Sequence, residues 1–549
     1  MTIYRKGIQK GEMATKDFDY VVDCFQKAIE FKPDSLIPYF CMAVFITSPV
    51  KNSSYKILRE VAEKFVEIGG ETGNIIAAIA YITIYIRSGL NQVGRDKFAE
   101  IEPEIYNRLE NISQEEVSLL YSQMLFHINY LRDDIEANTK FGRALGEKYV
   151  EKAIKPKNIK TATRTAKDCR QKPLNIGFLS SYFARHSIGW CSYDIIRELS
   201  NLTPNTYLYG TSQRQPDDRY QLFQKVGKKF YQANKFPNGL ADSQEIIEQI
   251  LQDEIDVLID LDSLTVPVQV EIIHQKPAPI CLSWLGFEPP FTDENNYFFC
   301  DWHTHPAGTE QYNREKLIRM PDSFVAVSGF ECKPIEREEI RKGLRLAKDQ
   351  VVFLCIAPAY KLNPELIEAQ VNIIKNVPDS VLLYKGHTGD VEVIKEAYHK
   401  KFQEMGIGLH RLKYLPLASS EEEHRTIYKI ADILLDSYPY NGGTHNLEAL
   451  WFNLPVITRT GEQHLSRMGY SFLRSLDIST GIARSWEEYT DWGIKLGQNT
   501  DLRQSVRERL IQSKQAETLA VLWNPKKFAQ DMYAKFEELL AEKISATNN

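Results

Sequence analysis

The sequence predicts an α/β protein in which two Rossmann-like domains face one cleft, preceded by an all-α N-terminal domain. Three observations support this prediction. The chain has 549 residues, which is too long for one hydrophobic core. Its first part shows only helical periodicity, and two later series of short apolar runs alternate with helical segments. Because strands that alternate with helices form parallel sheets with crossover helices, two such series predict two sheets.

Residues 1–152 are predicted to form the all-α domain. Residues 16–35 carry apolar side chains near one helix face and lead into a second helix from about Leu36. This pair resembles one tetratricopeptide unit, but no regular repeat follows it, so we expect a divergent helical array or a plain helical bundle. Further helices are expected at 54–68, 75–90, 94–110 and 114–131.

Residues 153–172 are polar and basic, which is typical of a linker. The first Rossmann-like half is assigned to 173–335 and the second to 336–549, with a polar segment near the division. Strands of the first half are expected at 174–180, 205–210, 229–233, 256–262 and 280–286, with helices between them such as 243–254. Strands of the second half are expected at 351–357, 380–386, 409–416, 432–436 and 454–460, and its helices at 363–376, 391–404, 420–430 and 445–452. A C-terminal helix from about Asn524 is expected to pack back on one of the two halves.

Composition excludes several classes of protein. The formal net charge of −6 and the pI of about 6.1 argue against nucleic-acid binding as the main activity. No apolar run approaches the length of a membrane span, and the polar N-terminus lacks the apolar core of a signal peptide. The eight cysteines include no Cys-x-x-Cys pair, which favours reduced thiols over disulfides or a zinc site. We therefore expect a cytoplasmic protein.

A glycine-rich turn between a strand and a helix is the first candidate site. In DSYPYNGGTHNLEALWFNLPVIT, residues 436–458, three turn formers follow an apolar run and precede Thr444, which lies near a helix N-cap. Such a turn places free N–H groups at the positive end of a helix, where anions, most often phosphates, bind. The carboxylate of Glu448 could accept hydrogen bonds from ribose hydroxyls. From this pattern alone, an ordinary glycine-rich turn is an equal alternative.

Seven blocks that occur in order resemble the O-GlcNAc transferase/SPINDLY family, glycosyltransferase family 41. They are LNIGFLSSYFARHSIG, DVLIDLDSLT, KPAPICLSWLGF, EKLIRMPDSF, FLCIAPAYKLNPE with NVPDSVLLYKG, ADILLDSYPYNGGTHNLEALWFNLPVIT, and GEQHLSRMG, within roughly 172–535. The resemblance implies a helical-repeat region joined to two Rossmann-like domains of the GT-B type. It also implies an inverting glycosyltransferase that needs no metal, and the short, irregular repeat region favours a bacterial member.

The resemblance also implies roles for single residues. Lys361 matches the family lysine that contacts the donor diphosphate, where a cation can neutralise charge on the leaving nucleotide. His186 matches a histidine at the mouth of the first domain that is a candidate general base or helps to shape the acceptor site. The positions matched to nucleotide-sugar binding are His424, Gly442, Gly443, Thr444, His445 and Glu448.

No metal site and no cofactor other than the donor are expected. Asp260 and Asp262 form a DxD pattern, which holds a divalent ion in other glycosyltransferases. Here the pattern ends a predicted strand in a block that matches a metal-independent family, so we interpret it as sheet-end hydrogen bonding. The other histidines, including the pair His303 and His305, lack a convincing set of metal ligands.

The expected donor is UDP-GlcNAc or UDP-glucose, and the expected acceptor is a protein Ser or Thr hydroxyl presented by the helical domain. The chain departs from the family in GFEPPF (286–291), at Ser263, at Pro358 and at His445, positions that lie near the sugar and the acceptor in relatives. Binding of the nucleotide is thus better supported than the identity of the sugar. GDP-fucose-dependent O-fucosylation and N-glucosylation of asparagine stay open, as does an inactive scaffold that keeps the fold.

Overall fold

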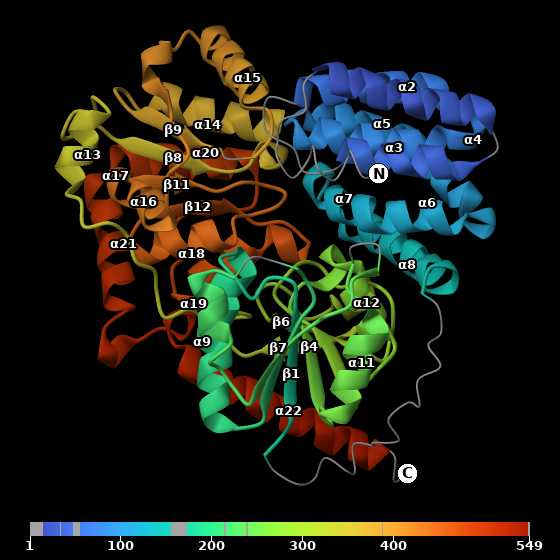
Figure 1. The fold of residues 1–549 in the computed structure, drawn as a ribbon. Coiled ribbons are helices and arrows are strands. Elements are labelled where there is room, and N and C mark those ends of the chain that lie inside the picture. Colours follow the sequence, from blue (N-terminus) through green and yellow to red (C-terminus); the bar gives the residue numbers. More distant parts are fainter. Residues whose placement is uncertain are drawn as a thin grey trace.

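The computed structural model describes residues 15–32, 35–47, 55–154, 173–213, 216–237, 240–386 and 388–546. Most of the predicted linker, 155–172, lies outside these residues. Figure 1 shows two parallel-sheet lobes, one above the other, with the N-terminal helices along one side of both. The predicted fold class is confirmed, whereas the domain boundaries at 152, 172 and 335 stay predictions.

The N-terminal region is entirely helical where it is described. One prediction was wrong in detail, because 54–68 and 75–90 belong to a single helix that continues through Gly69 and Gly70. Each glycine destabilises a helix by about 1 kcal/mol. The apolar residues 75–80 are all buried, and their burial stabilises the helix by more than the two glycines cost. The helices are α2 Thr15–Phe31, α3 Leu36–Thr47, α4 Tyr55–Arg87, α5 Asn91–Arg108, α6 Gln114–Leu119, α7 Leu125–Leu131 and α8 Ile135–Lys152.

The first lobe is built on a seven-stranded parallel sheet with the order β3-β2-β1-β4-β5-β6-β7. Its strands are β1 Ile176–Ser180, β2 Thr206–Gly210, β3 Lys229–Gln232, β4 Val257–Asp260, β5 Ile280–Ser283, β6 Tyr297–Asp301 and β7 Lys316–Met320. The five expected strands form, and β6 and β7 extend the sheet beyond them. The order places the carboxyl ends of β1 and β4 side by side at the topological switch point, where ligands bind in such sheets.

The second lobe repeats this architecture with six parallel strands in the order β10-β9-β8-β11-β12-β13. The strands are β8 Val352–Ile356, β9 Val381–Lys385, β10 Leu412–Tyr414, β11 Ile433–Leu435, β12 Val456–Arg459 and β13 Ile482–Ala483. Only β13 was not expected. The predicted helices appear as α14 Pro364–Asn376, α15 Val391–Glu404, α16 Glu421–Arg425, α17 Ile427–Ile430 and α18 Thr444–Trp451.

The C-terminal helix α22, Pro525–Ala546, returns to the first lobe, as Figure 1 shows below the green sheet. It packs on α9, Ser187–Leu202. The Leu174 backbone N–H donates to the Tyr533 hydroxyl at 3.2 Å, and Lys543 donates to the Pro279 carbonyl at 2.7 Å. The expectation that this helix packs back on one of the halves is confirmed.

The helical region is attached to both lobes. In the first lobe, Tyr121 donates to the Pro290 carbonyl at 2.7 Å. In the second, the Asp133 carboxylate accepts hydrogen bonds from the hydroxyls of Tyr438 and Ser466, both at 2.8 Å. These contacts hold the helical region against the edge of the space between the lobes. No described helix has the combination of length and apolarity that a membrane span requires.

Candidate active site

A cleft of about 800 Å³ lies between the two lobes and is lined by both of them and by helix α7. The structure brings nearly all the predicted site residues to this one cleft, although they come from four separate parts of the sequence. The predicted residues that line it are His186, Lys361, His424, Gly443, Thr444, His445 and Glu448. Gly442 is not among the lining residues.

Asp436 holds the glycine-rich turn in shape. It follows β11 directly, and its carboxylate accepts hydrogen bonds from the Gly442 N–H at 2.6 Å, the Asn446 amide at 2.8 Å and the Thr458 hydroxyl at 2.7 Å. Burial raises the pKa of Asp436 to about 6, against the effect of these hydrogen bonds. Asp436 was not predicted as a site residue, although an acid between a buried strand and a glycine-rich turn is a recognisable pattern.

The two glycines of the turn have different surroundings. The Gly442 N–H already donates to Asp436, and a Cβ at Gly442 would lie 2.8 Å from the Asn446 side chain. Gly443 is the N-cap of α18, so Thr444 begins the helix next to the N-cap as predicted, and a Cβ at Gly443 would meet nothing within 4 Å. Since Gly443 has no side chain, no side-chain cap covers the first turn of α18, and this positive helix end faces the cleft.

Lys361 ends the 3₁₀ turn Ala359–Lys361 that follows β8. Its ammonium donates to the Asn441 carbonyl at 2.7 Å and lies 3.6 Å from the centre of the Tyr440 ring. Burial lowers the pKa of Lys361 to about 7, while the Asp436 carboxylate acts in the opposite direction. A lysine desolvated in this way gains charge and stability when an anion enters the cleft beside it.

Glu448 and His424 lie together on the second-lobe wall. The Glu448 carboxylate accepts from Arg425 Nε at 2.8 Å and from the Tyr428 hydroxyl at 2.7 Å. Burial raises the pKa of Glu448, and the Arg425 charge offsets part of that effect. His424 Nε2 is 4.0 Å from the nearer Glu448 oxygen. Each carboxylate oxygen has a second lone pair, so Glu448 can still accept a hydrogen bond from a ligand.

His186 is the N-cap of α9 on the opposite wall of the cleft. The Ile188 N–H donates to His186 Nδ1 at 3.3 Å, and the ring stacks on Tyr182 with a centroid distance of 3.9 Å. A neutral imidazole that accepts at Nδ1 carries its proton on Nε2. In this tautomer His186 can donate a hydrogen bond from Nε2 but cannot accept a proton there.

Several lining residues were not foreseen from the sequence. Lys385 ends β9 and is 6% exposed, and burial lowers its pKa. Helix α7 contributes Phe126, which stacks on Phe287 at 4.8 Å, and Tyr130, which lies 5.1 Å from the Tyr440 ring. A lysine after a buried strand resembles Lys361 and could have been found, but nothing in the local sequence of α7 indicates that it reaches a cleft between two later domains.

The DxD pattern forms the predicted sheet-end hydrogen bonds. Asp262 accepts from the Ser180 hydroxyl at 2.8 Å and the Ser181 N–H at 2.6 Å, and Asp260 accepts from the Asp262 N–H at 2.9 Å. These bonds tie the ends of β1 and β4 together. Among the described residues, one group of side chains could hold a metal ion: His424, His445 and Glu448, whose ligand atoms all lie within 4.8 Å of one another.

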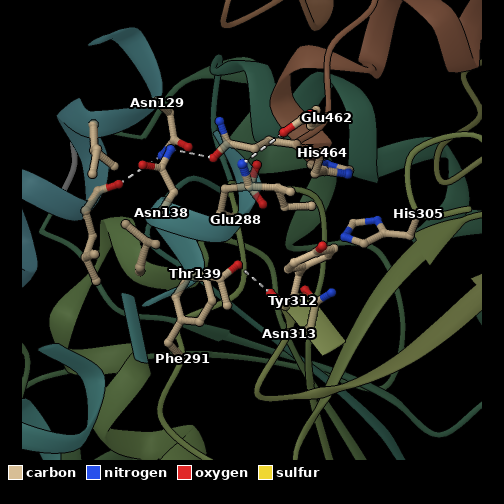
Figure 2. Close-up of a pocket in the computed structure, with 15 residues that line it drawn as sticks. Asn129, Asn138, Thr139, Glu288, Phe291, His305, Tyr312, Asn313, Glu462 and His464 are labelled. Carbon is tan, nitrogen blue, oxygen red and sulfur yellow. Dashed lines mark hydrogen bonds between the residues drawn. The ribbon is translucent and has the colours of Figure 1, made fainter. Parts of the chain in front are cut away.

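A second cavity of about 30 Å³ lies where the helical region meets both lobes. Figure 2 shows Glu288 in this cavity, between the side chains of α8 and His464. Glu288 accepts from the Leu465 N–H at 3.0 Å, and burial raises its pKa to about 7. The cavity holds little more than a water molecule, so it is a structural joint and not a substrate site.

The chain is similar to known proteins in sequence and in fold. The family model described as glycosyl transferase family 41 matches residues 140–332 and 335–532. A SPINDLY protein of Solanum lycopersicum, named as a probable UDP-N-acetylglucosamine–peptide N-acetylglucosaminyltransferase, is 24% identical over 361 residues, which are 62% of this chain and 37% of the relative. Its Arabidopsis thaliana counterpart is 26% identical over 354 residues, again 62% of this chain and 37% of the relative.

The chain therefore spans a little over a third of the curated relatives that it matches. Among solved structures, a variant of the Thermobaculum terrenum O-GlcNAc transferase superposes with a TM-score of 0.72 at 18% identity, covering 97% of this chain and 96% of that one. At this identity the likeness establishes the shared fold, helical region included.

Proposed function

Because the chain belongs to glycosyltransferase family 41, we propose that it transfers a sugar from a nucleotide sugar, UDP-GlcNAc or UDP-glucose, to a protein Ser or Thr hydroxyl. The observation that carries the proposal is the pairing of a desolvated lysine with an uncapped helix N-terminus in one interlobe cleft. Both features favour a diphosphate. The curated plant relatives, which are named for UDP-N-acetylglucosamine, support the choice of donor.

In this proposal the donor diphosphate lies between Lys361 and the first turn of α18, with Gly443, Thr444 and His445 around it. His424 and Glu448 contact the base and the ribose. The acceptor oxygen attacks the anomeric carbon from the face opposite the diphosphate, the bond from that carbon to the diphosphate oxygen breaks, and the configuration inverts. Lys361 and the helix end stabilise the negative charge of the leaving nucleotide, so the step requires no metal.

His186 is proposed to orient the acceptor or the sugar as a hydrogen-bond donor. Its Nδ1 accepts the Ile188 N–H, which assigns the ring proton to Nε2. The acceptor proton would then leave to a water molecule or to another base in the cleft. The helical region, whose Phe126 and Tyr130 line the cleft, would present the protein acceptor, and a cytoplasmic location is part of the proposal.

The test is donor turnover by the purified chain. UDP-GlcNAc, UDP-glucose, UDP-galactose and GDP-fucose are compared for nucleotide release with and without EDTA, using the parent, Lys361→Ala and, as a control, Lys527→Ala on the exposed side of α22. We expect release from a UDP donor that EDTA does not reduce, that Lys361→Ala abolishes and that Lys527→Ala leaves unchanged.

Release from GDP-fucose alone would replace the donor assignment, and transfer to asparagine would replace the acceptor. Binding without release, across all donors and with candidate acceptor peptides, would support the scaffold alternative. Absence of both binding and release would refute the proposal.

A further inference from the structure

We propose that His424, His445 and Glu448 form a binding site for one divalent transition-metal ion of the zinc type, and that this ion keeps the donor out of the cleft. The metal site itself is independent of the proposed function. The inhibition rests on that function, because the ion would occupy the position assigned to the ribose.

The three ligands come from two neighbouring helices. His424 belongs to α16, and His445 and Glu448 belong to the first turns of α18. His424 Nε2 lies 4.0 Å from a Glu448 oxygen, and the two imidazole centroids are 5.8 Å apart. Zinc bonds of about 2.0–2.2 Å place tetrahedral ligand atoms roughly 3.4 Å apart. The ligand atoms here lie within 4.8 Å of one another, so no pair needs to close by more than about 1.4 Å. Both rings are half-buried and border open cleft, which leaves them room to do so.

Glu448 is oriented as a metal-bound carboxylate usually is. Arg425 and Tyr428 hold one oxygen each, and carboxylate ligands in metal sites are commonly fixed by such outer hydrogen bonds. The oxygen that accepts from Tyr428 is the one that lies 4.0 Å from His424 Nε2, and it keeps a second lone pair. The cations Arg425 and Lys385 oppose a further positive charge here, so the site should bind its ion reversibly and more weakly than a structural zinc site does.

The donor set selects the kind of ion. Two imidazole nitrogens and one carboxylate oxygen suit zinc, cobalt or nickel, whereas magnesium and calcium prefer oxygen ligands throughout. The site is therefore distinct from the DxD–magnesium arrangement of other glycosyltransferases. Such an ion would inhibit transfer, and it is not a cofactor of it.

The test uses Co²⁺ alone as a spectroscopic probe on the full chain freed of metal. We expect one equivalent of Co²⁺ to produce a visible ligand-field band that Zn²⁺ removes. His445→Thr and His424→Gln should each weaken Co²⁺ binding by at least about tenfold, the scale at which even indirect disturbance of a metal site acts. His410→Gln, at an exposed histidine of the same lobe, is the matched control and should bind as the parent does. Thermal melting of each variant checks that it is folded.

The inhibition is measured as UDP binding to the parent at increasing Zn²⁺. A zinc concentration ten times its own Kd should raise the apparent Kd of UDP about elevenfold by mass action. A Co²⁺ band that persists in both folded histidine variants, or no band in the parent, would overturn the site. Unchanged or tighter UDP binding with zinc would overturn the competition. UDP binding to the metal-free chain, measured in the same series, tests the proposed function separately.

Discussion

Lys361 is only partly charged at neutral pH in the empty cleft, because burial lowers its pKa to about 7. A bound diphosphate favours the charged form and raises that pKa again. Above pH 7 the empty protein holds fewer protons at this site than the complex does, so UDP binding should take up a proton and weaken as the pH rises, by at most about tenfold per pH unit.

This prediction is checked by titration calorimetry at pH 8 in two buffers of different ionisation enthalpy. The parent and Lys527→Ala should show proton uptake that depends on the buffer. Lys361→Ala should bind UDP weakly and without uptake. Equal binding enthalpies in the two buffers for the parent would contradict a role for Lys361 in charge neutralisation.

The site residues that could be predicted from the sequence are those that begin a helix or lie in a motif shared with the family. Thr444 could be located from its place after a strand and a glycine-rich turn, whereas Lys361 was identified from the family resemblance, because a lysine just past a strand end is usually a solvated loop residue. Asp436 was missed because its importance lies in three hydrogen-bond partners, two of them from later elements. The tautomer of His186 likewise depends on one backbone N–H and is invisible in the sequence.

We expect two adjacent glycines of the turn to have different roles: Gly442 is needed for stability, and Gly443 is needed for ligand binding. Gly442→Ala should lower stability, because its Cβ would crowd Asn446 at 2.8 Å and Asp436 at 3.1 Å. Gly443→Ala meets no protein atom within 4 Å, but its methyl group would occupy ligand space at the helix end. We expect the second variant to keep most of its melting temperature and to lose UDP affinity.

Melting curves and UDP titrations of the two variants test this prediction side by side. If Gly443→Ala binds UDP as the parent does, the diphosphate does not approach the first turn of α18. If Gly442→Ala has the same melting temperature as the parent, the contacts of Gly442 with Asp436 and Asn446 do not determine the shape of the turn.

Most elements were predictable because their apolar runs match the period of a buried strand or an amphipathic helix. The exceptions have local causes. The edge strand β7 carries polar residues such as Lys316 and Arg319, which hide its apolar side, and β13 has only two residues. The run Tyr297–Asp301 is apolar and could have been predicted as β6. Helix α4 was divided in error because glycine usually ends helices, and tertiary packing overrode that tendency.

Glu288 makes the stability of the joint between the helical region and the two lobes depend on pH. Its pKa is raised by burial from 4.5 to about 7. The contribution of this neutral carboxyl to stability is complete below its unfolded pKa and is lost as the pH rises through about 7, at a cost of up to about 3 kcal/mol. Glu315 and Asp436, raised to about 7 and about 6, act in the same direction.

Glu288→Gln should therefore gain stability relative to the parent between pH 5 and pH 8, as measured by denaturant unfolding at both values. Glu136→Gln, at an exposed acid on α8, is the matched control and should show no such gain. If the difference in free energy of unfolding between Glu288→Gln and the parent is the same at both pH values, the Glu288 carboxyl is already charged in the folded joint at pH 5.

Phe126 and Tyr130 make the helical region part of the cleft wall and not merely a neighbour of it. A protein assembled by exchanging helical regions between relatives would thus inherit more than a new docking surface. It would also receive different side chains against Phe287 and Tyr440 in the cleft wall. Under the proposed function, an exchange of helical regions would therefore alter the acceptor surface and the wall of the donor cleft in a single step.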